Sequence, residues 1–336
     1  MARTSADVST VAVIGSGVVG RRVARQLAAS GLVERLILGA RRPQRMHGFV
    51  RQLIDVDVEV IAPGPLPAAD VTVLAQPSGG HTELAEEAIG NGSHVVSLSD
   101  ALNDVEGLLS LDSTAHKADR SVIVGAAFSP GLSCLLARHG GERFDRVEEV
   151  HVARMGTGGP SCQRQLHRAR TQQALERRNG SWMKRPSGTG RELVWFPDPL
   201  GAKDCYRAAL AEPVLLSASF PEAERITAKV AATRRDRLTA WLPMLRPPHK
   251  DGGPGAVRVE IRGVRDEIQT TEVIGAIDYP SAAAAAVAAI AAEWSLLGVL
   301  PSGSWSLGML DDPLPWLQEL ENRGITAAVY EGLSNT

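Results

Sequence analysis

The first 125 residues alternate short apolar runs with amphipathic stretches, the pattern of repeated strand and helix units. Strands are expected at 11–14, 35–40, 56–61, 71–75, 94–98 and 121–125, and helices at 18–29, 82–91 and 105–118. Strands that alternate with helices in this way form a parallel sheet covered on both faces. The pattern therefore predicts an α/β protein whose N-terminal part is a doubly wound parallel sheet.

The pattern changes after residue 130. Period-two alternation from Arg146 to Met155 predicts a half-buried strand, and 256–264 with 269–277 predict a hairpin. A helix is expected from Ser161, and another over 221–231. The Gly-, Pro- and Trp-rich stretch 179–208 is expected to be an ordered loop lining a pocket. These elements predict an α+β domain with an open sheet.

Three glycines follow the first expected strand, and their spacing indicates what this part of the chain binds. In VAVIGSGVVG (11–20), Gly15 suits a tight turn, Gly17 leaves room for a pyrophosphate, and Gly20 lets the helix approach the strand. This spacing between strand and helix is the dinucleotide-binding motif of a Rossmann domain, with the phosphates on the helix N-terminus. The predicted cofactor-binding residues of the turn are Gly15, Ser16, Gly17, Val18, Val19 and Gly20.

The end of the second expected strand indicates which dinucleotide binds. An NAD enzyme usually has an acidic residue there for the ribose 2′-hydroxyl, whereas this chain has Arg41 and Arg42. Guanidinium groups suit a 2′-phosphate, so NADP is predicted; a solvated loop is the alternative. Because ligands bind at the carboxyl ends of such strands, Gln76, Pro77 and Ser99 are also expected at the cofactor.

Several segments resemble the saccharopine dehydrogenase and saccharopine reductase family in order and spacing. They are PSGGH (77–81), HVVSLSD (94–100) and LDSTAHKADRSVIVGAAFSPGLS (111–133). The resemblance implies an NADP-dependent oxidoreductase that reduces an imine, or oxidises an amine, of an amino-acid-like metabolite. Where the family has G-x-D-P-G, this chain has Ala127-Phe128-Ser129-Pro130-Gly131, so a hydroxyl replaces an acidic substrate contact.

Candidate catalytic and substrate-binding groups come from both halves of the chain. Asp100 follows a strand and suits a substrate ammonium, although it equally suits a helix N-cap. Histidine is a common general acid or base, so His167 suits proton transfer, but its helix also fits a solvated basic face. The expected catalytic residues are His167, Asp100 and Tyr206, and the expected substrate-binding residues are His81, Ser129, Arg168, Arg170 and Arg191. For His81, packing at a helix start is the alternative.

Two other functions remain open from the sequence. One is an NADP-dependent carbonyl or hydroxy-group dehydrogenase, although the similar sugar dehydrogenases usually carry Lys-Pro where this chain has Ser99-Asp100. The other is an NADP(H)-binding sensor without catalytic activity. Turnover of NADPH with amine and carbonyl pairs separates these functions.

The composition of the chain indicates which classes of binding partner are expected. A net charge of −2 gives no reason to expect nucleic acid or an anionic membrane, and three distant cysteines give no metal motif. The alanine-rich run 281–292 is too short to span a bilayer, and residues 1–10 lack a secretion signal. We therefore expect a cytoplasmic homodimer acting on a small molecule. The expected domains are 1–130 for the dinucleotide, 131–280 for substrate and dimerisation, and 281–336 as C-terminal helices packing back on the first.

Overall fold

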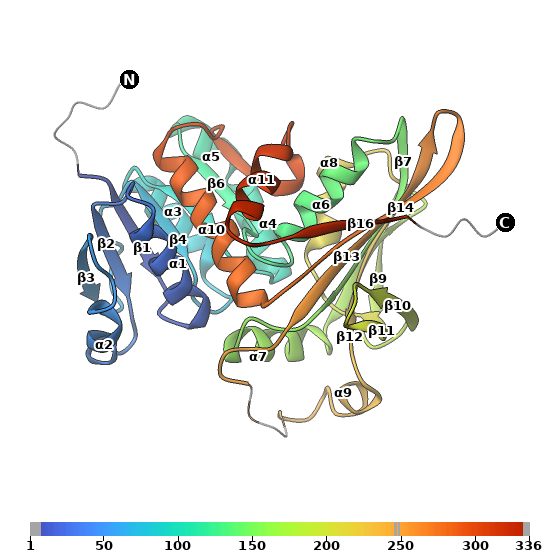
Figure 1. The fold of residues 1–336 in the computed structure, drawn as a ribbon, viewed down its shortest axis with the longest axis horizontal. Helices are drawn as coiled ribbons and strands as arrows, with labels where there is room; N and C mark the ends of the chain where they lie inside the picture. Colours follow the sequence, from blue (N-terminus) through green and yellow to red (C-terminus); the bar gives the residue numbers. More distant parts are fainter. Residues whose placement is uncertain (1–7, 245–246, 248, 332–336) are drawn as a thin grey trace.

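The chain folds around two β-sheets that share one continuous hydrophobic core (Figure 1). The computed structural model describes residues 8–244, 247 and 249–331. Within these residues, no helix is both long and apolar enough to cross a membrane.

The first sheet has seven strands, all parallel, in the order β15-β6-β5-β4-β1-β2-β3. Its strands are β1 (Thr10–Ile14), β2 (Arg35–Gly39), β3 (Asp57–Ile61), β4 (Val71–Leu74), β5 (His94–Ser97), β6 (Ser121–Val124) and β15 (Gly303–Ser306). Strands β1 to β6 lie in the order typical of a doubly wound dinucleotide-binding sheet. The order in which successive strands are added reverses between β1 and β4, although all the strands run parallel. The predicted fold class is therefore confirmed.

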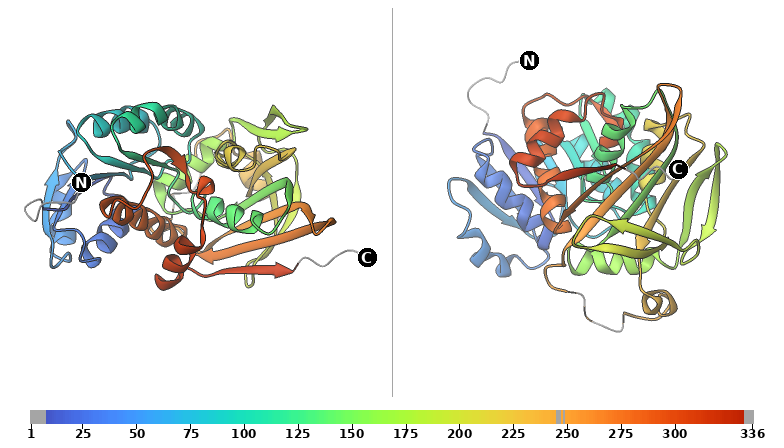
Figure 2. Two further views of the ribbon diagram at one scale, coloured as in Figure 1. Left: turned by 90° about the horizontal axis from the view of Figure 1, so that it is seen from above. Right: turned by 45° about the vertical axis from the view of Figure 1, so that its right-hand side comes forward.

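Helices cover both faces of this sheet. The left view of Figure 2 shows α3, α4 and α5 on one side and α1 with α10 on the other. The helices of the first half are α1 (Val18–Ala29), α2 (His47–Val50), α3 (His81–Gly90), α4 (Leu102–Ser110), α5 (Asp112–Lys117) and α6 (Leu132–Gly141), with a 3-10 turn η1 (Pro43–Met46). The helix expected over 105–118 is thus two helices that meet at Leu111.

The second sheet has nine strands and is mixed. They are β7 (Arg146–Met155), β8 (Gln173–Arg178), β9 (Ser181–Pro186), β10 (Glu192–Phe196), β11 (Gly201–Arg207), β12 (Arg225–Ala231), β13 (Gly255–Arg265), β14 (Ile268–Asp278) and β16 (Ala327–Glu331). The remaining helices are α7 (Pro160–Ala169), α8 (Glu212–Ser219), α9 (Arg234–Leu238), α10 (Pro280–Leu296) and α11 (Leu314–Asn322), with η2 (Leu307–Met309). The long β13–β14 hairpin is where the alternation predicted it.

Two expectations for the second half are wrong. Residues 221–231 were expected to be helical, but they contain β12, which pairs with β7 on one side and with β11 on the other. The expected aromatic loop is mostly strand, from β9 to β11, and the side chains of Trp182 and Trp195 are 47% and 68% exposed. Both segments become strands because partner strands supply their hydrogen bonds.

The C-terminal segment joins the two halves. The alanine-rich helix α10 packs along α1, because small side chains let two helices approach closely. After α10 the chain adds β15 to the first sheet and β16 to the second. This segment therefore contributes strands to both sheets as well as helices.

Candidate functional site

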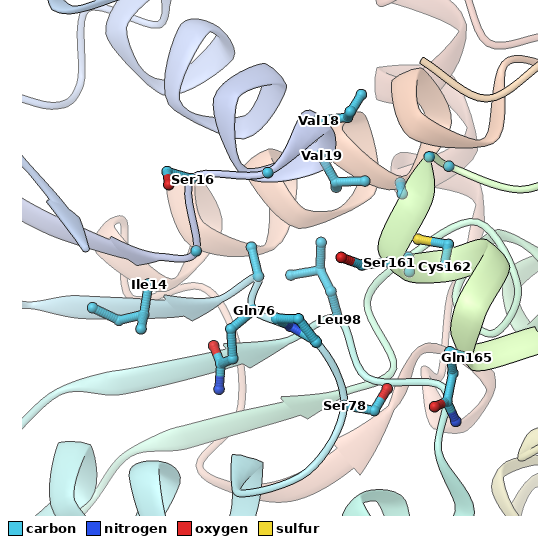
Figure 3. A pocket seen from close by; sticks show the side chains of 18 of the residues that line it. Ile14, Ser16, Val18, Val19, Gln76, Ser78, Leu98, Ser161, Cys162 and Gln165 are labelled. Atoms are coloured by element: carbon cyan, nitrogen blue, oxygen red, sulfur yellow. The ribbon is translucent and has the colours of Figure 1, made fainter. Parts of the chain in front are cut away.

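A cavity of about 650 Å³ lies where the carboxyl ends of the first sheet meet the second (Figure 3). Its walls are the turn after β1, the loops that follow β2 to β6, the end of β7, and α7. Figure 3 shows side chains from several of these walls, such as Ser16, Leu98 and Cys162, around one space. The switch point of a doubly wound sheet is where such folds bind their ligands.

The glycine turn forms one wall of this cavity, and each glycine meets a different constraint. Gly15 has φ +125°, and a Cβ there would lie 2.5 Å from the carbonyl carbon of Ala75. At Gly20 a Cβ would lie 1.8 Å from the carbonyl oxygen of Gly15, so the helix packs against the turn itself. At Gly17 a Cβ would have no neighbour within 4 Å, so this position faces open space. The first N–H groups of α1 are therefore available to an anion.

The far end of the cavity is basic. Arg41 lines it beside the loop 61–66, whereas the exposed Arg42 does not. Among the residues that the structure describes, Asp100 is the one acidic residue of the lining, and it follows β5 rather than β2. No carboxylate is therefore placed beside Arg41 to select a ribose hydroxyl.

The other end of the cavity holds a buried ion pair. Arg154 projects from β7, and its Nη2 lies 3.1 Å from Oδ2 of Asp100; Nη1 also donates to the carbonyl of Ser129. Burial lowers the pKa of Arg154, but the carboxylates of Asp100 and Glu212 outweigh it, and the net pKa is raised. The guanidinium is thus a permanent cation whose Nε has no hydrogen-bond partner among the described residues.

Two further groups complete this end. Burial raises the pKa of the Cys162 thiol to about 11, so at neutral pH it is a neutral group and a poor nucleophile. The Ser129 hydroxyl donates to the buried carboxylate of Glu212. The ion pair therefore supplies the two charges available to a ligand here.

Sequence reasoning missed Arg154. The signal was an arginine in phase with the buried positions Val150 and Val152 of the same strand, since alternate residues share one face of a sheet. A charged side chain on an apolar face needs a buried partner, and that requirement points to a site.

Ten of the candidate residues line the cavity. They are Gly15, Ser16, Gly17, Val18, Val19, Arg41, Gln76, Pro77, Asp100 and Ser129. Among the described residues, neither polar atom of the Gln76 side-chain amide has a hydrogen-bond partner, although both atoms are buried. This amide is therefore an unsatisfied polar group in the wall of the cavity.

The other candidates lie elsewhere. His167 Nε2 lies outside the cavity and donates to the Leu242 carbonyl oxygen, 2.8 Å away. Ser99 is buried and donates to Asp104, and Arg191 pairs with Asp204 on an exposed strand. Nine candidate residues lie outside the lining of this cavity: Gly20, Arg42, His81, Ser99, His167, Arg168, Arg170, Arg191 and Tyr206. Of these, Arg170 and Tyr206 line a different, smaller cavity.

His81 is a buried support beneath the site. Its Nδ1 lies 2.9 Å from the Ser97 hydroxyl, and its Nε2 lies 3.4 Å from the carbonyl oxygen of Gln76. Burial lowers the pKa of His81 below its ordinary 6.5, so the ring is neutral at pH 7. A neutral ring satisfies both contacts when Nε2–H donates to Gln76 and Ser97 donates to Nδ1.

A pH dependence of stability follows from this burial. Below pH 6.5 the unfolded His81 takes up a proton that the folded ring resists, so its contribution to stability decreases as the pH falls. We expect His81→Asn to lower the free energy of unfolding by about 1–3 kcal/mol above pH 6.5. The gap to wild type should narrow at acid pH, as measured by urea unfolding at several pH values. His151→Asn gives a comparison at a partly buried histidine whose pKa burial also lowers. A gap between His81→Asn and wild type that is constant with pH contradicts the assignment.

Comparison with known proteins supports the same architecture. Residues 10–118 match the model of the semialdehyde dehydrogenase NAD-binding domain. Saccharopine dehydrogenase (L-Glu forming) from Saccharomyces cerevisiae superposes with a TM-score of 0.71 at 15% identity, over 96% of this chain and 100% of that one. The DAP dehydrogenase of C. glutamicum gives a TM-score of 0.47 at 14% identity, over 93% of this chain and 98% of that one. The chain thus has the saccharopine dehydrogenase fold, built on an N-terminal NAD-binding domain, as its sequence motifs predicted.

Proposed function

We propose that this protein is an NADP-dependent oxidoreductase that reduces an imine, or oxidises an amine, of an amino-acid-like metabolite. The observation that carries this proposal is the single cavity that joins the glycine turn and Arg41 to the Asp100–Arg154 ion pair. A dinucleotide site and a site for a charged small molecule therefore share one space.

The residues of the cavity fit the cofactor. The open position at Gly17 and the start of α1 would hold the pyrophosphate, and Arg41 would hold the 2′-phosphate. The unpartnered amide of Gln76 fits a polar group of the cofactor or substrate. The nicotinamide supplies the hydride, so the protein need only orient the substrate and stabilise its charge.

The ion pair fits a substrate that carries both charges. Asp100 is the one carboxylate among the described residues of the lining, and it would hold a cationic nitrogen such as an iminium. Arg154 would hold the substrate carboxylate through its guanidinium, which has a free Nε. A hydroxyl or ketone group has no positive charge for Asp100 to bind, and this favours carbon–nitrogen chemistry over carbonyl chemistry.

Substitutions of two neighbouring arginines test whether the protein prefers NADPH to NADH. We expect Arg41→Ala to weaken NADPH binding by roughly tenfold to a hundredfold, the loss typical of a charged hydrogen bond, and to leave NADH binding nearly unchanged. Arg42→Ala is the matched control, because Arg42 lies outside the lining and its removal should change NADPH binding little. Fluorescence titration of both cofactors measures the effect. Equal losses of NADPH and NADH affinity in Arg41→Ala would contradict the role in 2′-phosphate binding.

The reaction class is tested by turnover. We expect NADPH consumption when a 2-oxo acid is supplied together with an amine, and none with the 2-oxo acid alone. Consumption with the carbonyl compound alone indicates the carbonyl dehydrogenase instead. Tight NADPH binding without turnover on any pair indicates the sensor.

A further inference from the structure

We propose that a second cavity, in the second domain, binds a small organic anion through Arg170 and Arg237. This cavity has a volume of about 270 Å³ and lies between the end of α7, the loop 187–189, β11 and α9. Arg170, Arg207 and Arg237 line it, and none of its described lining residues is acidic. The proposal does not rest on the proposed function, because no residue of this cavity lines the first one.

The three arginines of this cavity differ in whether a carboxylate neutralises their positive charge. Arg207 is fully paired, since its Nε donates to the buried carboxylate of Glu176 at 2.6 Å. Arg237 lies over the Tyr206 ring at 4.4 Å, and within the described parts of the chain it has no ion pair with a carboxylate. Its positive charge is therefore available at the mouth of the cavity, where Arg237 is exposed.

Arg170 is also short of a partner. Its Nη1 lies 3.8 Å from Oδ1 of Asp236, at the outer limit of an ion pair, and its Nη2 donates to the Ala231 carbonyl at 3.4 Å. The other oxygen of Asp236, Oδ2, accepts from the backbone and hydroxyl of Thr233. The Nε of Arg170 is buried, with no hydrogen-bond partner among the residues that the structure describes. A buried donor without a partner is costly, so the protein itself satisfies the guanidinium of Arg170 only in part.

The shape and lining of the cavity define the class of ligand. A guanidinium binds a carboxylate or a phosphate through paired N–H groups, and both arginines present such groups to the same space. Val230, Ala232 and Leu238 supply an apolar wall. The ligand is therefore a compact anion with a carboxylate or phosphate group and a short organic body. A cavity of this volume is too small for a dinucleotide.

The test uses the full chain and two probes, succinate and inorganic phosphate, with sodium chloride keeping the ionic strength constant. We expect saturable calorimetric binding of at least one probe to wild type. Arg237→Gln and Arg170→Gln should each weaken that binding roughly tenfold to a hundredfold. Arg234→Gln is the matched control, because Arg234 is an exposed arginine of the same helix outside the cavity lining. Thermal unfolding of Arg237→Gln should match wild type, since this side chain lies at the surface.

Three results would overturn the proposal. One is the absence of saturable binding of both probes. Another is equal binding by wild type and Arg237→Gln. The third is binding that Arg41→Ala abolishes while Arg237→Gln leaves it intact, because the anion would then occupy the first cavity. NADPH titration of Arg237→Gln keeps this test separate from the proposed function, since its NADPH affinity should equal that of wild type.

Discussion

Arg154→Leu is expected to abolish turnover and to lower the free energy of unfolding by about 2–4 kcal/mol, slightly below the usual cost of breaking a buried ion pair. Arg154 is 9% exposed and pairs with Asp100, whose side chain is 21% exposed. The substitution leaves the Asp100 carboxylate and the Ser129 carbonyl without their guanidinium partner. NADPH consumption measures the loss of turnover, and denaturant unfolding measures the loss of stability.

A second substitution separates the structural role of this pair from its role in binding substrate. Asp100→Asn added to Arg154→Leu removes the unpaired charge, so we expect the double variant to recover part of the lost stability. Turnover should stay absent, because neither substrate charge then has a partner. Substantial turnover in the stable double variant would exclude the ion pair from the reaction.

Alanine substitutions at Gly20 and Gly17 are expected to differ in their effect on stability. Gly20→Ala places a Cβ 1.8 Å from the Gly15 carbonyl oxygen, so it should lower the free energy of unfolding by about 1–3 kcal/mol, as overpacking does. Gly17→Ala meets no protein atom within 4 Å. It should change stability by less than about 1 kcal/mol, the cost of alanine at a helix N-cap.

Gly17→Ala is expected to change the affinity for the cofactor instead. The methyl group of Gly17→Ala enters the space proposed for the pyrophosphate, so NADPH binding should weaken roughly tenfold or more, equivalent to about 1.4 kcal/mol. Each glycine variant is compared with wild type by urea unfolding and by NADPH titration. Unchanged NADPH affinity in Gly17→Ala would place the pyrophosphate elsewhere.

The elements of the first sheet were predictable because their signals are local. Each apolar run is followed by a turn or by a helix start, and the helix over 18–29 has the predicted bounds. The second domain was less predictable because its strands depend on distant partners. Residues 225–231 form β12 through pairing with β7, about eighty residues earlier along the chain, and no local pattern encodes that pairing.

The same distinction applies to the candidate site. The glycine turn and Arg41 line the cavity that their local motif indicated. Arg154 was missed because its role arises from a contact with Asp100, 54 residues away. The polar helix around His167 looked functional from its spacing, but His167 is not among the residues of α7 that line the cavity. Those residues include Ser161, Cys162 and Gln165 (Figure 3).

The most direct test of the proposed function follows the hydride itself. NADPH deuterated at the nicotinamide C4, prepared in both stereochemical forms, is supplied with a 2-oxo acid and an amine, and the product is analysed by mass spectrometry. Our account predicts that one of the two forms transfers deuterium to the carbon bonded to nitrogen in a newly formed secondary amine. Deuterium found only in a hydroxy acid, or no transfer by a protein that binds NADPH tightly, would contradict it.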